Sequence, residues 1–139
     1  MRVVVDMNVL VSGLLRADNP PGRIVDLIVG GRLSVLFDDR ITREYEDVLS
    51  RPRFDFDATS VHAVLRQLRA TGEHVVAAPL AVVLPDPDDL PFLEVAVAGG
   101  ARALITGNRS HYKPRAGTHT VPVRSPRDFV TEWTHASSD

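Results

Sequence analysis

The chain opens with Val3-Val4-Val5-Asp6, an uninterrupted apolar run that ends on a carboxylate. Two later stretches have the same form: Val82-Val83-Leu84 precedes a group of aspartates, and Ala103-Leu104-Ile105 leads into Thr106-Gly107-Asn108. Apolar runs without polar alternation are typical of parallel strands covered on both faces, and ligands of such sheets bind where the strands' carboxyl ends meet. We therefore expect these three polar groups to converge on one acidic, metal-binding site.

Length and composition limit the class of protein. With 139 residues, 44% of them apolar, the chain can bury one sizeable core, and no linker-like stretch divides it. It contains no cysteine, which excludes disulfides, thiolate metal sites and cysteine nucleophiles. No apolar run is long enough for a membrane span, and Asp6 interrupts the apolar start, so we expect a cytosolic protein.

The net charge of -2 does not exclude an anionic substrate, because bound cations would neutralise clustered acids locally. Nearly all the positive charge is arginine, and Lys113 is the only lysine. Arginine suits phosphates and bases because its planar group donates two hydrogen bonds side by side. High genomic GC content would produce the same bias, so composition alone does not identify a nucleic-acid partner.

Apolar periodicity predicts strands that alternate with helices. Strands are expected over 2–6, 33–37, 81–84 and 103–105, with an edge strand over 120–123. Helices are expected over 8–15, 22–29, 39–49, 57–70, 90–98 and from 126 onward. This order predicts an α/β fold, a three-layer α/β/α sandwich with a mainly parallel central sheet. One domain should cover residues 1–134, followed by a frayed tail over 135–139.

Clustered carboxylates need a chemical reason, because like charges a few Å apart raise each other's pKa unless a cation compensates them. Mg²⁺ and Mn²⁺ bind carboxylate and water oxygens and can generate hydroxide and stabilise charge on a phosphodiester under attack. The chain has no nucleophile-elbow serine and no glycine-rich phosphate loop. Metal-dependent phosphodiester hydrolysis is therefore the chemistry that fits.

Each acid also has an ordinary structural interpretation. Asp6 is placed to cap the following helix, and Glu44 has charged neighbours, as a solvated helix residue would. Asp88 and Asp89 occupy positions suited to helix N-caps, each worth about 1 kcal/mol. One cap does not require three aspartates, however, so Asp86, Asp88 and Asp89 together favour a second role.

With these residues in place, the chain resembles the PIN-domain family. The resemblance spans nearly the whole chain in order and is carried by the stretch 3–15, by Glu44-Tyr45 and 48–52, by Asp86–Asp89 before Phe92-Leu93, and by Thr106-Gly107-Asn108. It is closest to VapC-type ribonucleases, the toxins of toxin–antitoxin pairs. The resemblance implies RNA cleavage with Mg²⁺ or Mn²⁺, a homodimer or higher homo-oligomer, and a cognate antitoxin protein.

Carried over by position, Asp6 matches the first catalytic carboxylate of the family and Glu44 the second. Asp89 is the expected third, because it immediately precedes an apolar helix, and its neighbours Asp86 and Asp88 compete for the same role. The fourth position is normally acidic but is Asn108 here. The expected metal ligands are therefore Asp6, Asp86, Asp88, Asp89 and Asn108. An amide adds no negative charge, so affinity for a second ion should be reduced.

Further polar residues flank these positions. Asn8, Ser12 and Thr106 are expected to support the site by hydrogen-bonding carboxylates or metal-bound water, although each could simply satisfy local backbone groups. Arg109, Lys113 and Arg115 are candidate contacts to RNA phosphates, although a solvated loop would carry the same charges. The five histidines show no ligand spacing, so no transition-metal site is expected.

Two other classes of protein remain as alternatives. A PIN-like module that binds RNA or a protein partner without cutting is favoured by Asn108 alone. A haloacid-dehalogenase-like phosphatase would need a second acid where Asn8 stands and a lysine before the acidic cluster, whereas Lys113 follows it.

Overall fold

The computed structural model describes residues 1–137. Within them, five parallel strands form one sheet in the order β3-β2-β1-β4-β5. The strands are β1 (Arg2–Val5), β2 (Ser34–Phe37), β3 (Glu73–His74), β4 (Ala103–Ile105) and β5 (Val123–Arg124). The helices are α1 (Met7–Leu15), α2 (Pro20–Val29), α3 (Asp39–Leu49), α4 (Ala58–Thr71), α5 (Leu90–Gly99) and α6 (Pro126–Ser137), with short 3-10 helices η1 (Pro87–Asp89) and η2 (Arg109–Tyr112).

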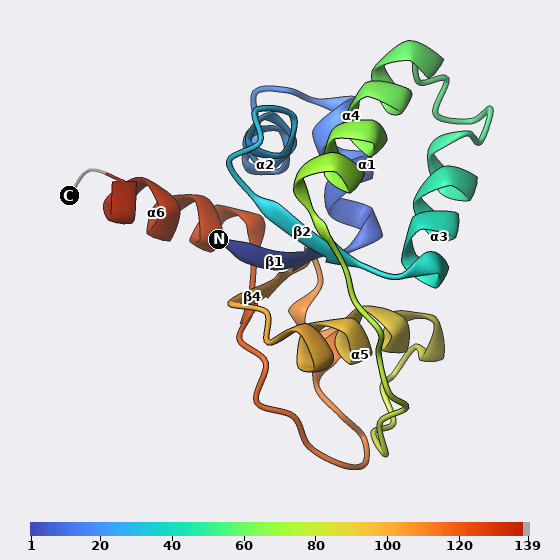
Figure 1. Cartoon of the computed structure of the whole chain (residues 1–139), viewed down its shortest axis with the longest axis vertical. Coiled ribbons are helices and arrows are strands. Elements are labelled where there is room, and N and C mark those ends of the chain that lie inside the picture. Colours follow the sequence, from blue (N-terminus) through green and yellow to red (C-terminus); the bar gives the residue numbers. More distant parts are fainter. Residues whose placement is uncertain (138–139) are drawn as a thin grey trace.

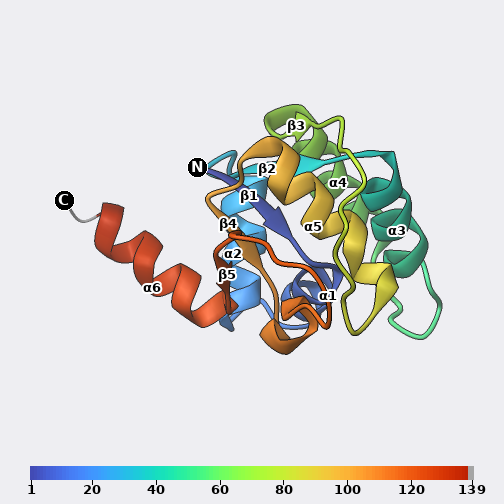
Figure 2. The same ribbon diagram turned by 90° about the horizontal axis from the view of Figure 1, so that it is seen from below.

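Helices cover both faces of the sheet, which confirms the predicted α/β/α sandwich. Figure 1 shows α1, α2, α3 and α4 on one side of the strands and α5 on the other. Helix α6 packs near α2 and then extends away from the body of the molecule, as Figure 2 also shows. None of the helices described in residues 1–137 has both the length and the apolar character needed to cross a membrane.

The central strands are buried as their apolar sequence predicts. Val3, Val4 and Val5 of β1 are each 0% exposed, because helices pack on both sides of them. Val5 pairs with Ile105 of β4, and the backbone N–H of Asp6 donates to the Ile105 carbonyl over 2.9 Å. This register brings the carboxyl ends of β1 and β4 side by side.

The predicted strand over 81–84 is wrong. Within this segment only Val83 makes a bridge, an isolated antiparallel one to Ala116, and the strand beside β2 is instead the two-residue β3. Val83 is 55% exposed while Val82 and Leu84 are buried, so the segment covers the core with one face only. Pro79 and Pro85 lack the backbone N–H groups that a sheet ladder needs, so a strand here could not extend beyond residues 80–84.

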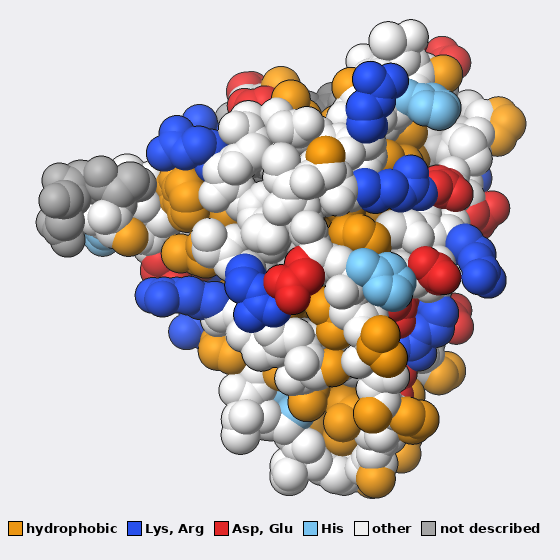
Figure 3. Space-filling view, viewed as in Figure 1, with side chains coloured by type: hydrophobic (Ala, Val, Ile, Leu, Met, Phe, Trp, Pro, Cys, Tyr) orange, Lys and Arg blue, Asp and Glu red, His pale blue; other side chains and the backbone are white. Residues whose placement is uncertain are grey.

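This segment forms part of an apolar surface at the lower end of the molecule. In Figure 3, orange side chains gather where Figure 1 shows the loops that follow β3 and η2. Val76 and Val83, which lie in the chain between β3 and η1, are exposed. The apolar run at 82–84 therefore reflects partial burial under a loop and not a place in the sheet.

The chain's C-terminal elements also differ in detail from the prediction. The edge strand is shifted from 120–123 to Val123–Arg124. Pro122 cannot donate to the ladder, although its carbonyl accepts from Leu104 N over 2.8 Å. Helix α6 includes residues 135–137 of the predicted tail, and residues 138–139 lie outside the described residues. The other predicted strands and helices are present with small shifts at their ends.

Candidate metal centre

Asp6 lies at the centre of the site, where β1 turns directly into α1. Its side chain is 4% exposed. Oδ1 accepts a hydrogen bond from the backbone N–H of Met7 over 2.7 Å, and Oδ2 accepts one from the Thr106 hydroxyl over 2.8 Å. Burial raises the pKa of Asp6, and the hydrogen bond from Thr106 opposes that rise. Asp6 therefore caps α1, as its ordinary interpretation predicts. Its carboxylate also lies at the edge of the sheet where β1 ends.

Asn8 and Thr106 connect the ends of β1 and β4. Asn8 Oδ1 accepts from the backbone N–H of Gly107 over 3.1 Å, and its amide nitrogen lies 3.5 Å from Asp6 Oδ2. The Thr106 hydroxyl also accepts from the Asn108 backbone N–H over 3.1 Å. Ser12 makes none of these bonds but lines a hollow of about 230 Å³ with Asn8 and Asn108. Asn8 and Thr106 therefore make hydrogen bonds across the ends of β1 and β4, whereas Ser12 lines only the hollow.

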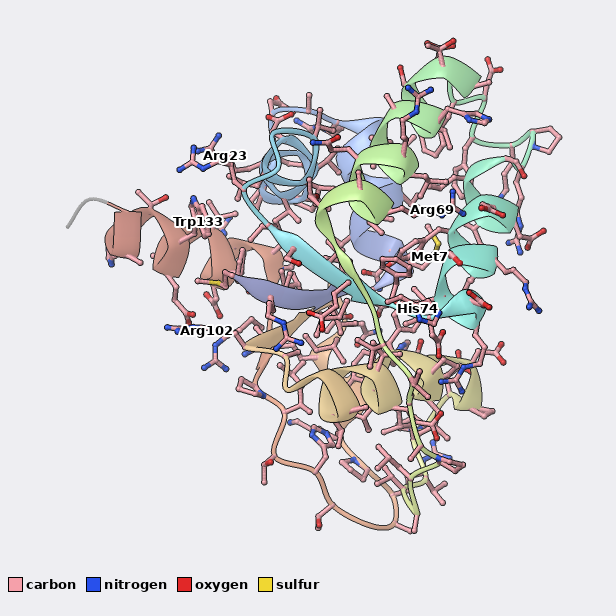
Figure 4. The ribbon with its side chains drawn as sticks, in the orientation of Figure 1. Met7, Arg23, Arg69, His74, Arg102 and Trp133 are labelled. Atoms are coloured by element: carbon pink, nitrogen blue, oxygen red, sulfur yellow. The ribbon has the colours of Figure 1, made fainter. Side chains whose placement is uncertain are left out.

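Helix α3 brings Glu44 to the same edge. Its neighbour Tyr45 is 0% exposed and donates a hydrogen bond to the carbonyl of Val5, the residue before Asp6. The side chain of Met7, the first residue of α1, lies on the side of that helix that faces α3 (Figure 4), and the two helices are in contact. The turn of α3 that carries Glu44 is thus fixed to the end of β1.

The acids from separate elements influence one another electrostatically. Burial, followed by the negative charges of Asp6 and Asp89, raises the pKa of Glu44 to about 7. Burial and the charge of Asp6 likewise raise the pKa of Asp89 to about 6. Asp86 and Asp88 act in the same direction on both groups. Since such effects weaken with distance, acids from β1, α3 and η1 gather in one region.

Helix capping does not explain Asp89. Asp86 caps η1 by accepting from the backbone N–H of Asp88 over 2.9 Å, and the Asp88 side chain is exposed. Asp89 stands at the N-cap position of α5 but makes no capping bond through its side chain. Asp86 therefore has a structural function, whereas the Asp89 carboxylate is left for another one.

The site contains two buried oxygen atoms without a hydrogen-bond partner in the described structure, Asp89 Oδ2 and Tyr112 Oη. The Tyr112 hydroxyl lies near enough to Asp6 to lower the pKa of that acid, but the pair does not reach the geometry of a formed hydrogen bond. Burial and the charge of Asp6 in turn raise the pKa of Tyr112. An orphaned carboxylate oxygen among acids of raised pKa fits a hard divalent cation.

The side chains are not closed around an ion position. Among residues 1–137, no three histidine, aspartate or glutamate side chains lie close enough together to hold one metal ion as they stand. Asp6 follows β1 and Asp89 precedes α5, and these two elements pack against each other.

Asn108 is joined to Asp89 through His111, a residue that the sequence analysis did not select. The Asn108 amide nitrogen lies 2.9 Å from His111 Nε2, and His111 Nδ1 lies 3.4 Å from Asp89 Oδ2. His111 comes three residues after Asn108, on η2, and this spacing across one short helical turn is the only sequence feature that relates them.

Two of the three predicted RNA-binding residues lie beside this edge. Arg109 and Lys113 line a hollow of about 690 Å³ together with Asn108 and Tyr112. Arg115 is not part of that lining, and its backbone N–H instead donates to the Val83 carbonyl over 2.7 Å. A larger cavity, of about 810 Å³ between α3 and α4, includes none of the predicted site residues.

Comparison with known proteins identifies the family. A family model for the PIN domain matches residues 2–110, which extend from β1 into η2 and include Asp6, Glu44 and Asp89. A search of curated proteins gave no significant match. Because the family model covers most of the chain, including every element that supplies an acid to the site, the chain belongs to the PIN-domain family, whose members are generally metal-dependent nucleases.

Proposed function

We propose that this protein is an endoribonuclease that uses Mg²⁺ or Mn²⁺ to hydrolyse phosphodiester bonds in RNA. The observation that carries the proposal is the buried Oδ2 of Asp89, which has no hydrogen-bond partner among the described residues and lies in a cluster with Asp6 and Glu44. These three acids concentrate negative charge where the described structure supplies no arginine or lysine ion pair to them. A divalent cation would neutralise that charge.

The acids have separate roles in this proposal. Asp6 and Asp89 would hold the ion, with Asp86 and Asp88 as further candidate ligands and Asn108 as a neutral one. When bound, the ion would supply an activated water molecule and stabilise charge on the phosphate. A cation would also lower the pKa of Glu44 toward its ordinary value, so that Glu44 is ionised and can orient water. Thr106 and the backbone of Met7 keep the Asp6 carboxylate in place.

Arg109 and Lys113 would bind the RNA backbone next to these acids. Both side chains are exposed and line the hollow that contains Asn108. Their positive charge would offset the repulsion between the acidic edge and an incoming phosphate. Arg115 is also exposed, further along the same loop, and would make a weaker contact.

We infer that the cellular role is that of the toxin in a type II toxin–antitoxin pair, acting in the cytoplasm as a homodimer or higher homo-oligomer. PIN-family membership and the VapC-like sequence pattern support this role. Expression should arrest growth, and both Asp6→Asn and co-expression of a cognate antitoxin should relieve the arrest. Equal arrest by the natural protein and by Asp6→Asn would contradict the toxin role.

RNA cleavage by the purified protein tests the nuclease directly. The natural chain should cut single-stranded or structured RNA with Mn²⁺ or Mg²⁺ and stop when the ion is chelated. Glu44→Gln should lose cleavage, while Asp47→Asn, an exposed change on the same helix, should retain it. A generic phosphomonoester assayed in parallel tests the haloacid-dehalogenase alternative, which predicts that this substrate is turned over and RNA is not.

Asn108 supports one other candidate, a PIN-like module that binds RNA or a partner without cutting. In that case the natural chain would bind RNA but leave it intact, and Asn108→Asp would create cleavage by restoring an acid. Cleavage by the natural chain that Asn108→Asp does not strengthen would rule this candidate out.

A further inference from the structure

A series of polar contacts joins Asn108, the one uncharged residue among the proposed metal ligands, to the acid Asp89. It runs from Ser110 through Asn108 and His111 to Asp89. We propose that Asn108 acts through His111: it selects the imidazole tautomer that carries its proton on Nδ1, and this N–H positions the Asp89 carboxylate. The consequence for metal binding rests on the proposed function, whereas the form of the imidazole does not.

The orientation of the Asn108 amide determines the form of the imidazole. The Ser110 hydroxyl donates to Asn108 Oδ1 over 2.8 Å, which leaves the amide nitrogen facing His111 Nε2 at 2.9 Å. An amide nitrogen can only donate a hydrogen bond, so Nε2 must accept one. In a neutral imidazole that accepts at Nε2, the proton is on Nδ1.

The proton on Nδ1 faces the orphaned oxygen of the site. His111 Nδ1 lies 3.4 Å from Asp89 Oδ2, the buried atom that has no hydrogen-bond partner in the described residues. A formed N–H···O bond is about 2.7–3.2 Å long, so a shift of a few tenths of an Å would complete it. Movement of Asp89 toward a bound ion would be guided by this donor.

His111 is therefore a positioning residue and not a metal ligand. Its Nε2 lone pair is occupied by Asn108, and its Nδ1 carries a proton, so neither nitrogen is free to bind an ion. Donors that hold a ligating carboxylate affect metal binding even though they do not touch the metal. An acid at position 108 would change the arrangement, because a carboxylate can only accept a hydrogen bond, so Nε2 would have to carry a proton to face it. Asn108 and His111 thus form a matched pair.

Nitrogen-15 NMR of the metal-free full-length protein tests the form of the imidazole. At a pH of about 8, where histidine is normally neutral, His111 should carry its proton on Nδ1 and leave Nε2 bare in the natural chain, whereas Nε2 should be protonated in Asn108→Asp. His119 is an internal reference that should carry its proton on the other ring nitrogen. Its Nδ1 accepts from Val121 N over 3.1 Å and its Nε2 faces the Tyr112 carbonyl at 2.8 Å, so it should be protonated on Nε2 in both proteins. A natural His111 protonated on Nε2 would overturn the proposal.

Mn²⁺ affinity, measured from the electron paramagnetic resonance of free Mn²⁺, tests the positioning role. His111→Leu removes the donor and should weaken binding by about 10-fold or more. His111→Asn keeps an N–H close to the position of Nδ1 and should retain most of the affinity. His62→Leu, an exposed change on α4, should have no effect.

The outcomes of the two measurements separate the two proposals. Equal Mn²⁺ affinities for His111→Leu and the natural chain would overturn the positioning role and leave the nuclease proposal standing. No Mn²⁺ binding by the natural chain would overturn the proposed metal site and the positioning role together. The NMR result would still identify the form of the imidazole in that case.

Discussion

The protein has two groups of wholly or partly buried carboxylates and provides an arginine countercharge for only one. Asp38 and Glu94 are 9% and 6% exposed, and Arg40 lies 2.7 Å from a carboxylate oxygen of each. Their other oxygens accept backbone N–H groups, from Ile41 at 3.1 Å and from Leu80 at 3.0 Å. All four oxygens of this pair therefore have partners, and the group joins α3, α5 and the segment before η1.

The acids at the sheet edge lack such compensation. Asp89 Oδ2 has no hydrogen-bond partner within the described structure, and burial with neighbouring charge raises the pKa of Glu44 and of Asp89. Buried charge destabilises a protein unless it is paired. The comparison indicates that Asp38 and Glu94 stabilise the fold, whereas the edge acids cost stability that binding of a cation would recover.

Asp6→Asn should have the largest effect. It removes the central charge of the edge group but keeps the shape of the side chain, and RNA cleavage should fall on the order of 10²–10³-fold. Thermal stability should be maintained, because a buried charge is lost while an amide can still bond Met7 and Thr106. Cleavage rates and melting curves of the two proteins would check both parts. Full cleavage by Asp6→Asn would remove this acid from the proposed mechanism.

Arg40→Met should leave Asp38 and Glu94 without a countercharge, as the acids at the sheet edge are. The change leaves Asp38 and Glu94 buried without their shared countercharge, and we expect the free energy of unfolding to fall by about 3 kcal/mol, the low end for a buried pair because Arg40 is half exposed. Urea unfolding would measure the loss. Arg43→Met, an exposed change on the same helix, is the control and should be close to neutral. Equal effects of the two changes would show that this network does not stabilise the fold.

Much of the fold could be predicted because its evidence is local in the sequence. The run Val3–Val5 is buried on both faces, and its register with β4 follows from a similar run at 103–105, so the meeting of Asp6 and Thr106 was predictable. The segment 82–84 misled because its three apolar residues suggested burial on both faces. Its actual alternation of buried, exposed and buried side chains depends on a loop contact with Ala116.

The site was less predictable, because tertiary contacts assemble it. Glu44 has no local feature that distinguishes it from the charged residues around it, and only the family resemblance selected it. Its position depends on the bond between Tyr45 and Val5, forty residues apart in sequence. His111 reaches Asp89 across two loops, and no spacing rule relates them. Distant pairs of this kind are determined by the packing of α3, η1 and η2 and not by any one segment.

Mn²⁺ should stabilise the folded protein by compensating the edge group. An ion that binds only the native state at about 100 times its dissociation constant adds about 2.7 kcal/mol to the free energy of unfolding. The melting temperature should therefore rise with Mn²⁺ in the natural chain and rise much less in Asp89→Asn. Asp47→Asn, whose carboxylate is exposed and away from the cluster, should respond like the natural chain. Identical shifts in all three proteins would place the ion elsewhere.

The smallest expected effect is the pH dependence of stability without metal. The folded-state pKa is raised to about 7 for Glu44 and to about 6 for Asp89, above their ordinary values of 4.5 and 3.8. At pH values between the ordinary and the raised pKa of each acid, the folded state binds more protons than the unfolded state. The free energy of unfolding should therefore decrease as the pH rises from about 4 to about 7. Both carboxyls are partly solvated, which reduces the expected change to about 1 kcal/mol.

Glu44→Gln should flatten the decrease, and saturating Mn²⁺ should remove it, because the cation pairs the charges that otherwise repel. Urea unfolding at several pH values would measure this, and a stability that instead rises over the window would show that the edge acids are already compensated.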